Sequence, residues 1–261
     1  MHLDIEMLST DRGRYLDDLY KKYNRRDCVH PDPLEFLYDY EDPHDREIVG
    51  LISSSLAYGR VRQIHKSVHS ILDRMKPSPS IFLNRASLVS LLSTFSEFKH
   101  RFTTGEEIAF LLIGIKGVIE RYGSLYNCFI AGLNDDDTVL PAVSRFVKEL
   151  HIGRKGRFKS LIPSPIKGSA CKRLNLFLRW MVRSDGVDPG GWDRVPASKL
   201  IVPLDTHMHR ISLFINLTTR KQADMRTALE ITDSFRMISP DDPVKYDFAL
   251  TRLGIRNGKN L

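Results

Sequence analysis

Cysteine is scarce in this chain. Its 261 residues include only Cys28, Cys128 and Cys171, and these stand far apart. Three widely spaced thiols provide neither a disulfide framework nor a four-cysteine metal site. His207 and His209 are two residues apart, so on a helix their side chains diverge and do not form a metal-binding pair. We therefore expect no resident metal and no cofactor.

Long hydrophobic runs are also missing. The longest apolar run extends from Ala109 to Ile115, whereas a helix needs about 20 apolar residues to cross a bilayer. Residues 1–15 lack the apolar core of a signal peptide. Together with the cysteine content, this favours a protein of the reducing cytoplasm that does not enter a membrane.

Runs of alternating polar and apolar residues, which would indicate strands, are absent as well. Almost every periodic segment has helical spacing, and the sequence therefore predicts an all-α fold. Prolines 31, 33 and 43 rule out a continuous helix across residues 25–45, which we expect to form a loop. Asp42 is predicted to start the helix that follows this loop. The expected helices cover residues 12–23, 44–60, 61–75, 87–95, 106–122, 124–133, 139–150, 169–183, 205–217, 221–237 and 243–253.

Acidic residues are fewer than basic ones, 32 against 39, which leaves a formal charge of +7. The excess is concentrated between Arg145 and Arg183, where eleven Lys or Arg residues accompany a single acid, Glu149. Such a concentration favours a polyanionic partner, although part of the segment could instead be a flexible basic linker. The cations expected to contact nucleic-acid phosphates are Arg154, Lys155, Arg157, Lys159, Lys167, Arg173, Arg179 and Arg183.

Lys172 occupies an unfavourable position for a lysine. Ser169 is a plausible helix N-cap, and a capping box would place Glu or Gln where Lys172 stands. The positive end of the helix dipole and the neighbouring Arg173 both disfavour a charged ammonium there, and a neutral amine is a nucleophile. At 3.6 residues per turn, Lys172 heads a basic stripe with Arg179 and Arg183. The alternative is an ordinary solvated lysine.

Asp205 marks the start of another helix. Pro203 precedes it, and an aspartate at an N-cap is held ionised by the helix dipole and by backbone N–H groups. Two opposite charges at two helix starts would form a reactive arrangement, so Lys172 and Asp205 are the candidate catalytic residues. The alternative for Asp205 is a simple cap that contributes about 1 kcal/mol.

The stretch IVPLDTHMHRIS, residues 201–212, resembles the helix-hairpin-helix GPD superfamily of DNA glycosylases, in which a similar run introduces the catalytic aspartate. Gly168 and Lys172 match the Gly-x-Gly-x-Lys end of the hairpin motif, with Ala170 in place of the second glycine. The Lys-to-Asp spacing is nearest to the archaeal 8-oxoguanine branch. The segments DPLEF, LNLFLRWMVR and DPVKYDFAL also resemble an uncharacterised bacterial family that is usually grouped with this superfamily.

The resemblance implies a fold and a reaction. It implies two helical subdomains with a cleft between them: a helical barrel of residues 45–167, and a second part made of residues 1–44 and 168–261. The iron-sulfur cluster of several such glycosylases is excluded, because it needs four cysteines. The implied activity is that of a DNA glycosylase with AP-lyase activity on a damaged base, an oxidised purine being one candidate. In that reaction Lys172 forms a Schiff base with the sugar and Asp205 stabilises the charge.

Four further residues are candidates for contact with an extruded base or with the opened duplex. By the resemblance, Tyr58, Gly59 and Arg60 border the lesion pocket, although Tyr58 could equally be half-buried and Gly59 could simply end a helix. Trp192 could stack on a base or plug the interface between subdomains. Asp185 and Asp188, with Asp193, could bind magnesium, but we favour a role in balancing the charges of the basic stripe.

Two other functions are compatible with the same pattern. One is a non-catalytic nucleic-acid-binding protein on the same scaffold, which would bind in a salt-dependent way without covalent chemistry. The other is an all-α enzyme that acts on a small phosphorylated substrate held by the basic stripe. We also expect Asp247, an acid within an otherwise apolar helix, to be hydrogen-bonded.

Overall fold

The computed structural model describes residues 2–153, 158 and 160–256. It is mostly helical, as predicted. The elements are α1 (His2–Tyr23), α2 (Pro43–Ser55), α3 (Val61–Arg74), α4 (Pro79–Arg85), α5 (Leu88–Thr94), β1 (Lys99–His100), β2 (Thr103–Thr104), α6 (Gly105–Tyr122), α7 (Leu125–Ile130), α8 (Leu140–Leu150), α9 (Lys172–Val182), α10 (Thr206–Phe214), α11 (Met225–Arg236) and α12 (Asp247–Arg256).

The helix starts follow from capping chemistry that is visible in the sequence. Asp42 is the N-cap of α2, as predicted, and its side chain accepts a hydrogen bond from the backbone N–H of Asp45. Thr104 and Glu107 form a reciprocal capping box at α6. At the other end of α6, Gly123 adopts φ = 81°, a left-handed conformation that suits a helix C-terminus.

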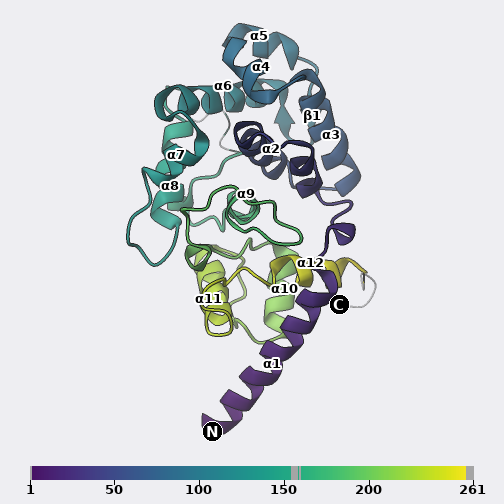
Figure 1. Ribbon diagram of the computed structural model, residues 1–261, viewed down its shortest axis with the longest axis vertical. Coiled ribbons are helices and arrows are strands. Elements are labelled where there is room, and N and C mark those ends of the chain that lie inside the picture. Colours follow the sequence, from purple (N-terminus) through teal and green to yellow (C-terminus); the bar gives the residue numbers. More distant parts are fainter. Residues whose placement is uncertain (1, 154–157, 159, 257–261) are drawn as a thin grey trace.

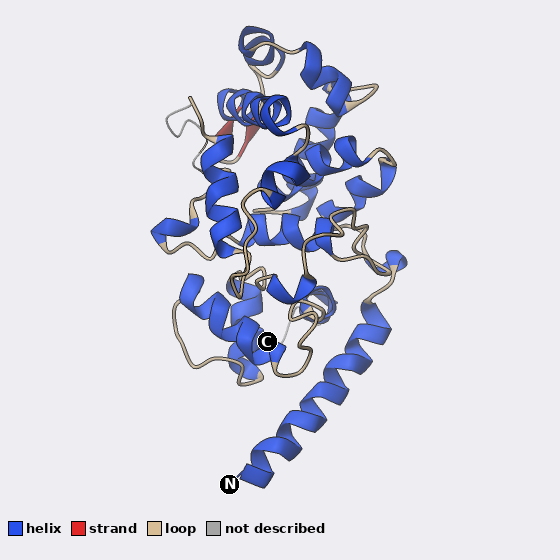
Figure 2. Ribbon diagram, turned by 60° about the vertical axis from the view of Figure 1, so that its left-hand side comes forward, coloured by secondary structure: helices blue, strands red, loops and turns tan. Residues whose placement is uncertain are grey.

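Helices gather at the two ends of the molecule, with α9 between them (Figure 1). Helices α3 to α6 lie at one end and α10 to α12 at the other, while α1 extends away from the body toward its N-terminus (Figures 1 and 2). Helix α9 packs along α2, and α1, whose buried residues Leu16, Leu19 and Tyr23 lie toward its C-terminal end, packs on α12. The division at residues 45 and 167 into two subdomains stays a prediction.

Several local features differ from the sequence prediction. Residues 33–39 form a 3-10 helix rather than a loop, because Pro33 occupies its first turn, where no N–H is needed. The short helix α4 was not expected; it has a Ser78 cap and Pro79 at its first position. A two-stranded hairpin, β1 with β2, lies between α5 and α6 in an otherwise helical chain. These elements are too short to show a periodic pattern.

None of the described helices combines the length and the apolar character that a membrane crossing requires.

Candidate active site

Lys172 is the first residue of α9, and its backbone is placed by an unusual residue before it. The N-cap is Cys171 rather than the expected Ser169, and Cys171 adopts φ = 47°, in the left-handed region that non-glycine residues avoid. Ser169 contributes differently, since its hydroxyl accepts a hydrogen bond from the Cys171 N–H at 3.3 Å. The amide of Asn175 donates to the carbonyl of Ala170 at 3.0 Å and closes the same turn. The turn therefore fixes where the side chain of Lys172 begins.

Asp205 is the N-cap of α10, as predicted. Its Oδ1 accepts hydrogen bonds from the backbone N–H groups of His207, at 3.0 Å, and Met208, at 2.8 Å. Its Oδ2 lies 3.2 Å from the Nζ of Lys172. One oxygen thus caps the helix while the other faces the lysine. The structure brings the two candidate catalytic side chains together from helices that are 33 residues apart in sequence.

The pair is open to a ligand. The side chains of Lys172 and Asp205 are 30% and 37% exposed, so they are neither buried in the core nor free in solvent. Burial by itself would raise the pKa of Asp205, but the Lys172 charge and the N–H groups of Met208 and His207 outweigh it and lower that pKa. Asp205 is therefore a carboxylate at neutral pH.

Arg173 connects the start of α9 to the other half of the chain. Its guanidinium donates hydrogen bonds to the carbonyl of Ser55, at the end of α2, at 2.8 Å and to the carbonyl of Ser160. The same group lies 5.1 Å from the centre of the Tyr58 ring, within the range of a cation–π contact. Arg173 is half-buried, so it combines this structural role with partial access to the surface.

The prediction that Arg179 and Arg183 face nucleic acid is wrong. Both arginines are buried, at 2% and 5% exposure. Arg179 pairs with Asp188 and with Asp247 of α12, and Arg183 pairs with Asp185, Asp188 and Asp242. The predicted charge balance by Asp185 and Asp188 is confirmed, as is a hydrogen-bonded Asp247. The helical spacing was read correctly, but the loop after α9 and helix α12 cover that side of α9.

Trp192 belongs to the core rather than to a base-binding surface. It is 2% exposed, and its ring lies within about 5–5.5 Å of Tyr126, Phe129 and Phe177. The expected role in stacking on an extruded base is therefore contradicted by burial.

The segment after α2 carries Tyr58, Gly59 and Arg60. Tyr58 is half-buried, and its hydroxyl donates to the carbonyl of His100 at 3.0 Å. Gly59 has φ = 93°, and a Cβ there would lie 2.7 Å from Cδ of Arg101. Arg60 is exposed at the start of α3. Gly59 and Arg60 are thus exposed, whereas the half-buried Tyr58 holds the β-hairpin in place.

Other predicted cations are not described in atomic detail. Arg154, Lys155, Arg157 and Lys159 lie outside the described residues, and of Lys167 only the backbone is described, in a short 3-10 turn from Pro165 to Lys167. Their contact with phosphates stays a prediction.

The residues described near Lys172 favour neither a reactive thiol nor a metal site. Cys171 is buried, its Sγ lies 3.5 Å from the carbonyl oxygen of Pro163, and burial raises the pKa of the thiol. Among the described side chains, no group of three or more His, Cys, Asp or Glu residues is arranged to hold a metal ion.

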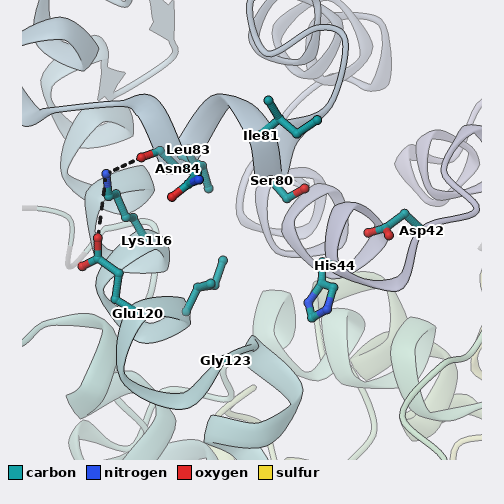
Figure 3. Close-up of a pocket in the computed structure, with 10 residues that line it drawn as sticks. Asp42, His44, Ser80, Ile81, Leu83, Asn84, Lys116, Glu120 and Gly123 are labelled. Carbon is teal, nitrogen blue, oxygen red and sulfur yellow. Dashed lines mark hydrogen bonds and ion pairs between the residues drawn. The ribbon is translucent and has the colours of Figure 1, made fainter.

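A pocket of about 330 Å³ lies elsewhere, between α2, α4 and α6 (Figure 3). Lys116, which lines this pocket, already has polar partners. Its Nζ donates to the carbonyls of Asn84 at 2.9 Å and Ala86 at 2.8 Å and lies 3.8 Å from Glu120. Neither Lys172 nor Asp205 lines this pocket. We therefore base the candidate site on the Lys172–Asp205 pair and not on the cavity.

Sequence reasoning missed the hairpin beside Gly59. The signal was present in Thr103 and Thr104, two β-branched residues after the cations Lys99 and Arg101, but two-residue strands are too short for a period-2 pattern.

Comparison with known proteins identifies the family of this chain but gives no activity. Residues 32–256 match a family model described as "Protein of unknown function (DUF2400)". No curated protein and no solved structure matches the chain.

Proposed function

This chain belongs to the DUF2400 family of proteins of unknown function, and we propose that it is a DNA glycosylase with AP-lyase activity that removes a damaged base, an oxidised purine being our first choice. Double-stranded damaged DNA is the proposed partner. The observation that carries the proposal is the distance of 3.2 Å between Lys172 Nζ and Asp205 Oδ2 at the starts of two helices.

In the proposed reaction, the damaged nucleotide leaves the base stack and its sugar enters beside the pair. Lys172 Nζ, as the free amine, attacks C1′; the bond from C1′ to the base breaks, and the base leaves with the electron pair and takes up a proton. The resulting sugar–lysine adduct opens to a Schiff base, as expected of a lysine nucleophile. The lysine ammonium must first lose a proton to solvent, so that Asp205 stays a carboxylate during the attack.

Asp205 supports this reaction through its charge. Because its pKa is lowered, it stays ionised at neutral pH and can stabilise the positive charge that develops on the sugar. The N–H groups of His207 and Met208 hold the carboxylate in place, so no reorganisation is needed as the charge forms.

We extend the proposal to the fold. In it, residues 45–167 form a barrel-like subdomain, residues 1–44 and 168–261 form the second, and the cleft of a helix-hairpin-helix GPD protein lies between them. Two contacts support this assignment: α9 packs on α2, and Arg173 donates to Ser55 at the end of α2. Lys172 is next to Arg173, so the pair would lie where the two subdomains meet.

Borohydride trapping tests the proposal. Wild type is incubated with duplexes that contain 8-oxoguanine, uracil, an abasic site or no lesion, and borohydride reduces any Schiff base to a stable adduct. We expect a lesion-dependent adduct that Lys172→Gln abolishes. Lys172→Arg is the matched control, because it keeps a cation beside Asp205 but cannot form a Schiff base; it should bind DNA and give no adduct.

Two results would contradict the proposal. An adduct that persists in both variants would exclude Lys172 as the nucleophile. Absence of any adduct and of base release with wild type, accompanied by tight and salt-sensitive binding, would instead indicate a non-catalytic nucleic-acid-binding protein.

A further inference from the structure

The tip of the β-hairpin exposes an aromatic ring. In the antiparallel pair, Lys99 faces Thr104 and His100 faces Thr103, so Arg101 and Phe102 form a two-residue turn. Phe102 is 80% exposed. The other strongly exposed phenylalanine among the described residues is Phe214, at 74%, on α10. A single exposed phenylalanine needs no explanation by itself, so the surroundings of the ring matter.

The hairpin and the segment around Gly59, which the Arg101 side chain contacts, carry four cations and no acid. Residues 59–63 and 99–104 contain Arg60, Arg62, Lys99 and Arg101 and no Asp or Glu, and all four cations are exposed. Within the described part of the chain, none of them forms an ion pair. Val61, 42% exposed, adds a second apolar side chain. An exposed aromatic ring accompanied by unpaired cations is the combination that binds bases and phosphates together.

The base of the hairpin is buried and hydrogen-bonded, although its tip is exposed. His100 and Thr103 are buried, at 0% and 1% exposure. The hydroxyl of Tyr58 hydrogen-bonds to Thr103 Oγ1 at 2.7 Å and to the carbonyl of His100. His100 in turn contacts the carbonyl of Tyr58 through Nε2 at 3.1 Å and Ser67 Oγ through Nδ1 at 2.9 Å. Since a carbonyl only accepts, Nε2 carries the proton, and burial lowers the pKa of this histidine.

Backbone strain at the tip places a cation. Arg101 adopts φ = 52°, a conformation that glycine or asparagine would take more easily. Its side chain lies against Gly59, where a Cβ would be only 2.7 Å from Arg101 Cδ. The guanidinium lies 5.4 Å from the Phe102 ring. Strain of this kind persists where surrounding contacts hold the backbone in place. Here the strained backbone of Arg101 places its guanidinium beside the Phe102 ring.

The hairpin is connected to the candidate active site. Tyr58, which anchors the hairpin, lies under the guanidinium of Arg173, the neighbour of Lys172. Arg173 thus links Lys172, its neighbour in the chain, to the residue that anchors the hairpin.

We propose that Phe102 is a stacking residue that enters the base stack of a nucleic acid at a weakened step, while Arg60, Arg62, Lys99 and Arg101 bind the flanking phosphates. The inference rests on the proposed function for the choice of a lesion-containing duplex as ligand. A preformed apolar wedge with cations around it favours an unstacked step over an intact one, because opening the stack costs less there.

The test measures binding and unstacking without requiring catalysis. The probe is a duplex with a 2-aminopurine next to an abasic-site analogue that cannot react, and it is compared with the same duplex without the abasic site. Wild type should increase the 2-aminopurine fluorescence of the duplex that contains the abasic site. Phe102→Ala should lose that increase and bind about 5- to 150-fold more weakly, the range expected for one stacked base, while Phe102→Trp should restore both.

Two further variants separate stacking from charge and from general surface effects. Arg101→Gln should reduce the dependence of log affinity on log salt by about one unit and retain part of the fluorescence increase. Phe214→Ala, an equally exposed aromatic without the four-cation surroundings, should change neither quantity. Thermal melting of each variant should match wild type, since these side chains are exposed.

Three results would overturn the inference. One is that Phe102→Ala unstacks the 2-aminopurine and binds the duplex as well as wild type does. Another is that the wild-type protein binds neither duplex. The third is Phe102-dependent binding of polyglutamate in preference to DNA, which would indicate an acidic protein partner. Failure of borohydride trapping with intact Phe102-dependent unstacking would contradict only the proposed catalysis, so the two failures are distinguishable.

Discussion

The two carboxylate oxygens of Asp205 have different partners. A substitution can therefore remove the negative charge of Asp205 and keep its role as a helix cap. Oδ1 accepts from the N–H groups at the start of α10, and Oδ2 faces Lys172. Asparagine caps helices about as well as aspartate. Replacing only the charge therefore tests whether this residue is more than a helix cap.

For Asp205→Asn we expect a free energy of unfolding within about 1 kcal/mol of wild type, because the cap survives and a partly exposed ion pair contributes little. The yield of borohydride-trapped adduct should fall at least tenfold, since the charge opposite the sugar is lost. Urea denaturation and trapping on the preferred duplex measure the two effects.

Asp224 provides the matched control. It caps α11 by accepting from the Thr227 N–H at 2.9 Å, with backbone angles close to those of Asp205. Asp224→Asn should leave both the stability and the adduct yield unchanged. Equal adduct yields for Asp205→Asn and wild type would reduce Asp205 to a structural cap.

At the scale of elements, buried ion pairs fasten α9 to the C-terminal part of the chain. Arg179 of α9 reaches Asp247 at the start of α12, and Asp188 in the loop after α9 contacts both Arg179 and Arg183. Side chains of Arg179 and Asp188 are 3% and 0% exposed. Removing one partner of such a network leaves an unpaired buried charge.

We expect Arg179→Gln to lower the free energy of unfolding by about 3–5 kcal/mol, because Asp247 loses its buried counter-charge and Asp188 keeps only Arg183. The slope of log affinity against log salt for DNA should stay the same, since Arg179 reaches no phosphate. Urea denaturation and salt titration measure these quantities. A reduced salt slope with unchanged stability would restore the original prediction that Arg179 binds nucleic acid.

Helix-level reasoning from the sequence succeeded where a local rule decides the outcome. Asp42 and Asp205 are N-caps because their short carboxylates reach nearby N–H groups, and the helices behind them show a clear apolar period. The exposure of Arg179 could not be predicted, because it depends on α12, which lies some 70 residues later in the sequence. Periodicity defines the face of a helix but not what covers that face.

The contact between Lys172 and Asp205 is an intermediate case. Each helix start is visible in the sequence, but the distance between the two depends on how α9 and α10 are placed by residues 183–204. The hairpin beside Gly59 was invisible for another reason: its two-residue strands carry no period, and its stability comes from Tyr58 and His100, which are about 40 residues apart.

On the scale of the whole molecule, Glu47 joins two helices across the core and makes stability depend on pH. It lies on α2, its side chain is 3% exposed, and its carboxylate accepts the N–H groups of Leu125 at 2.7 Å and Tyr126 at 3.0 Å, at the start of α7. Burial raises its pKa from 4.5 to about 7, although those two hydrogen bonds oppose the shift.

A raised pKa means that the folded chain holds a proton more tightly than the unfolded chain. The stabilisation is complete below pH 4.5, and it is lost as the pH rises through about 7. We therefore expect Glu47 to lower the free energy of unfolding by roughly 2–3 kcal/mol between pH 5 and pH 8. Above pH 5 the aspartates with lowered pKa values, such as Asp205, stay ionised and do not contribute.

Glu47→Gln isolates this contribution, because burial also raises the pKa of Asp188, to about 6, and adds a dependence of the same sign. The glutamine oxygen can accept only one of the two N–H groups, so the variant should be about 1–3 kcal/mol less stable than wild type at pH 5, and this difference should shrink as the pH rises. Its unfolding free energy, measured by urea denaturation from pH 5 to pH 8, should fall less steeply than that of wild type. Parallel pH profiles for the two proteins would show that Glu47 does not titrate in this range. In that case the junction of α2 with α7 would contribute equally to stability at every pH in which the protein is assayed.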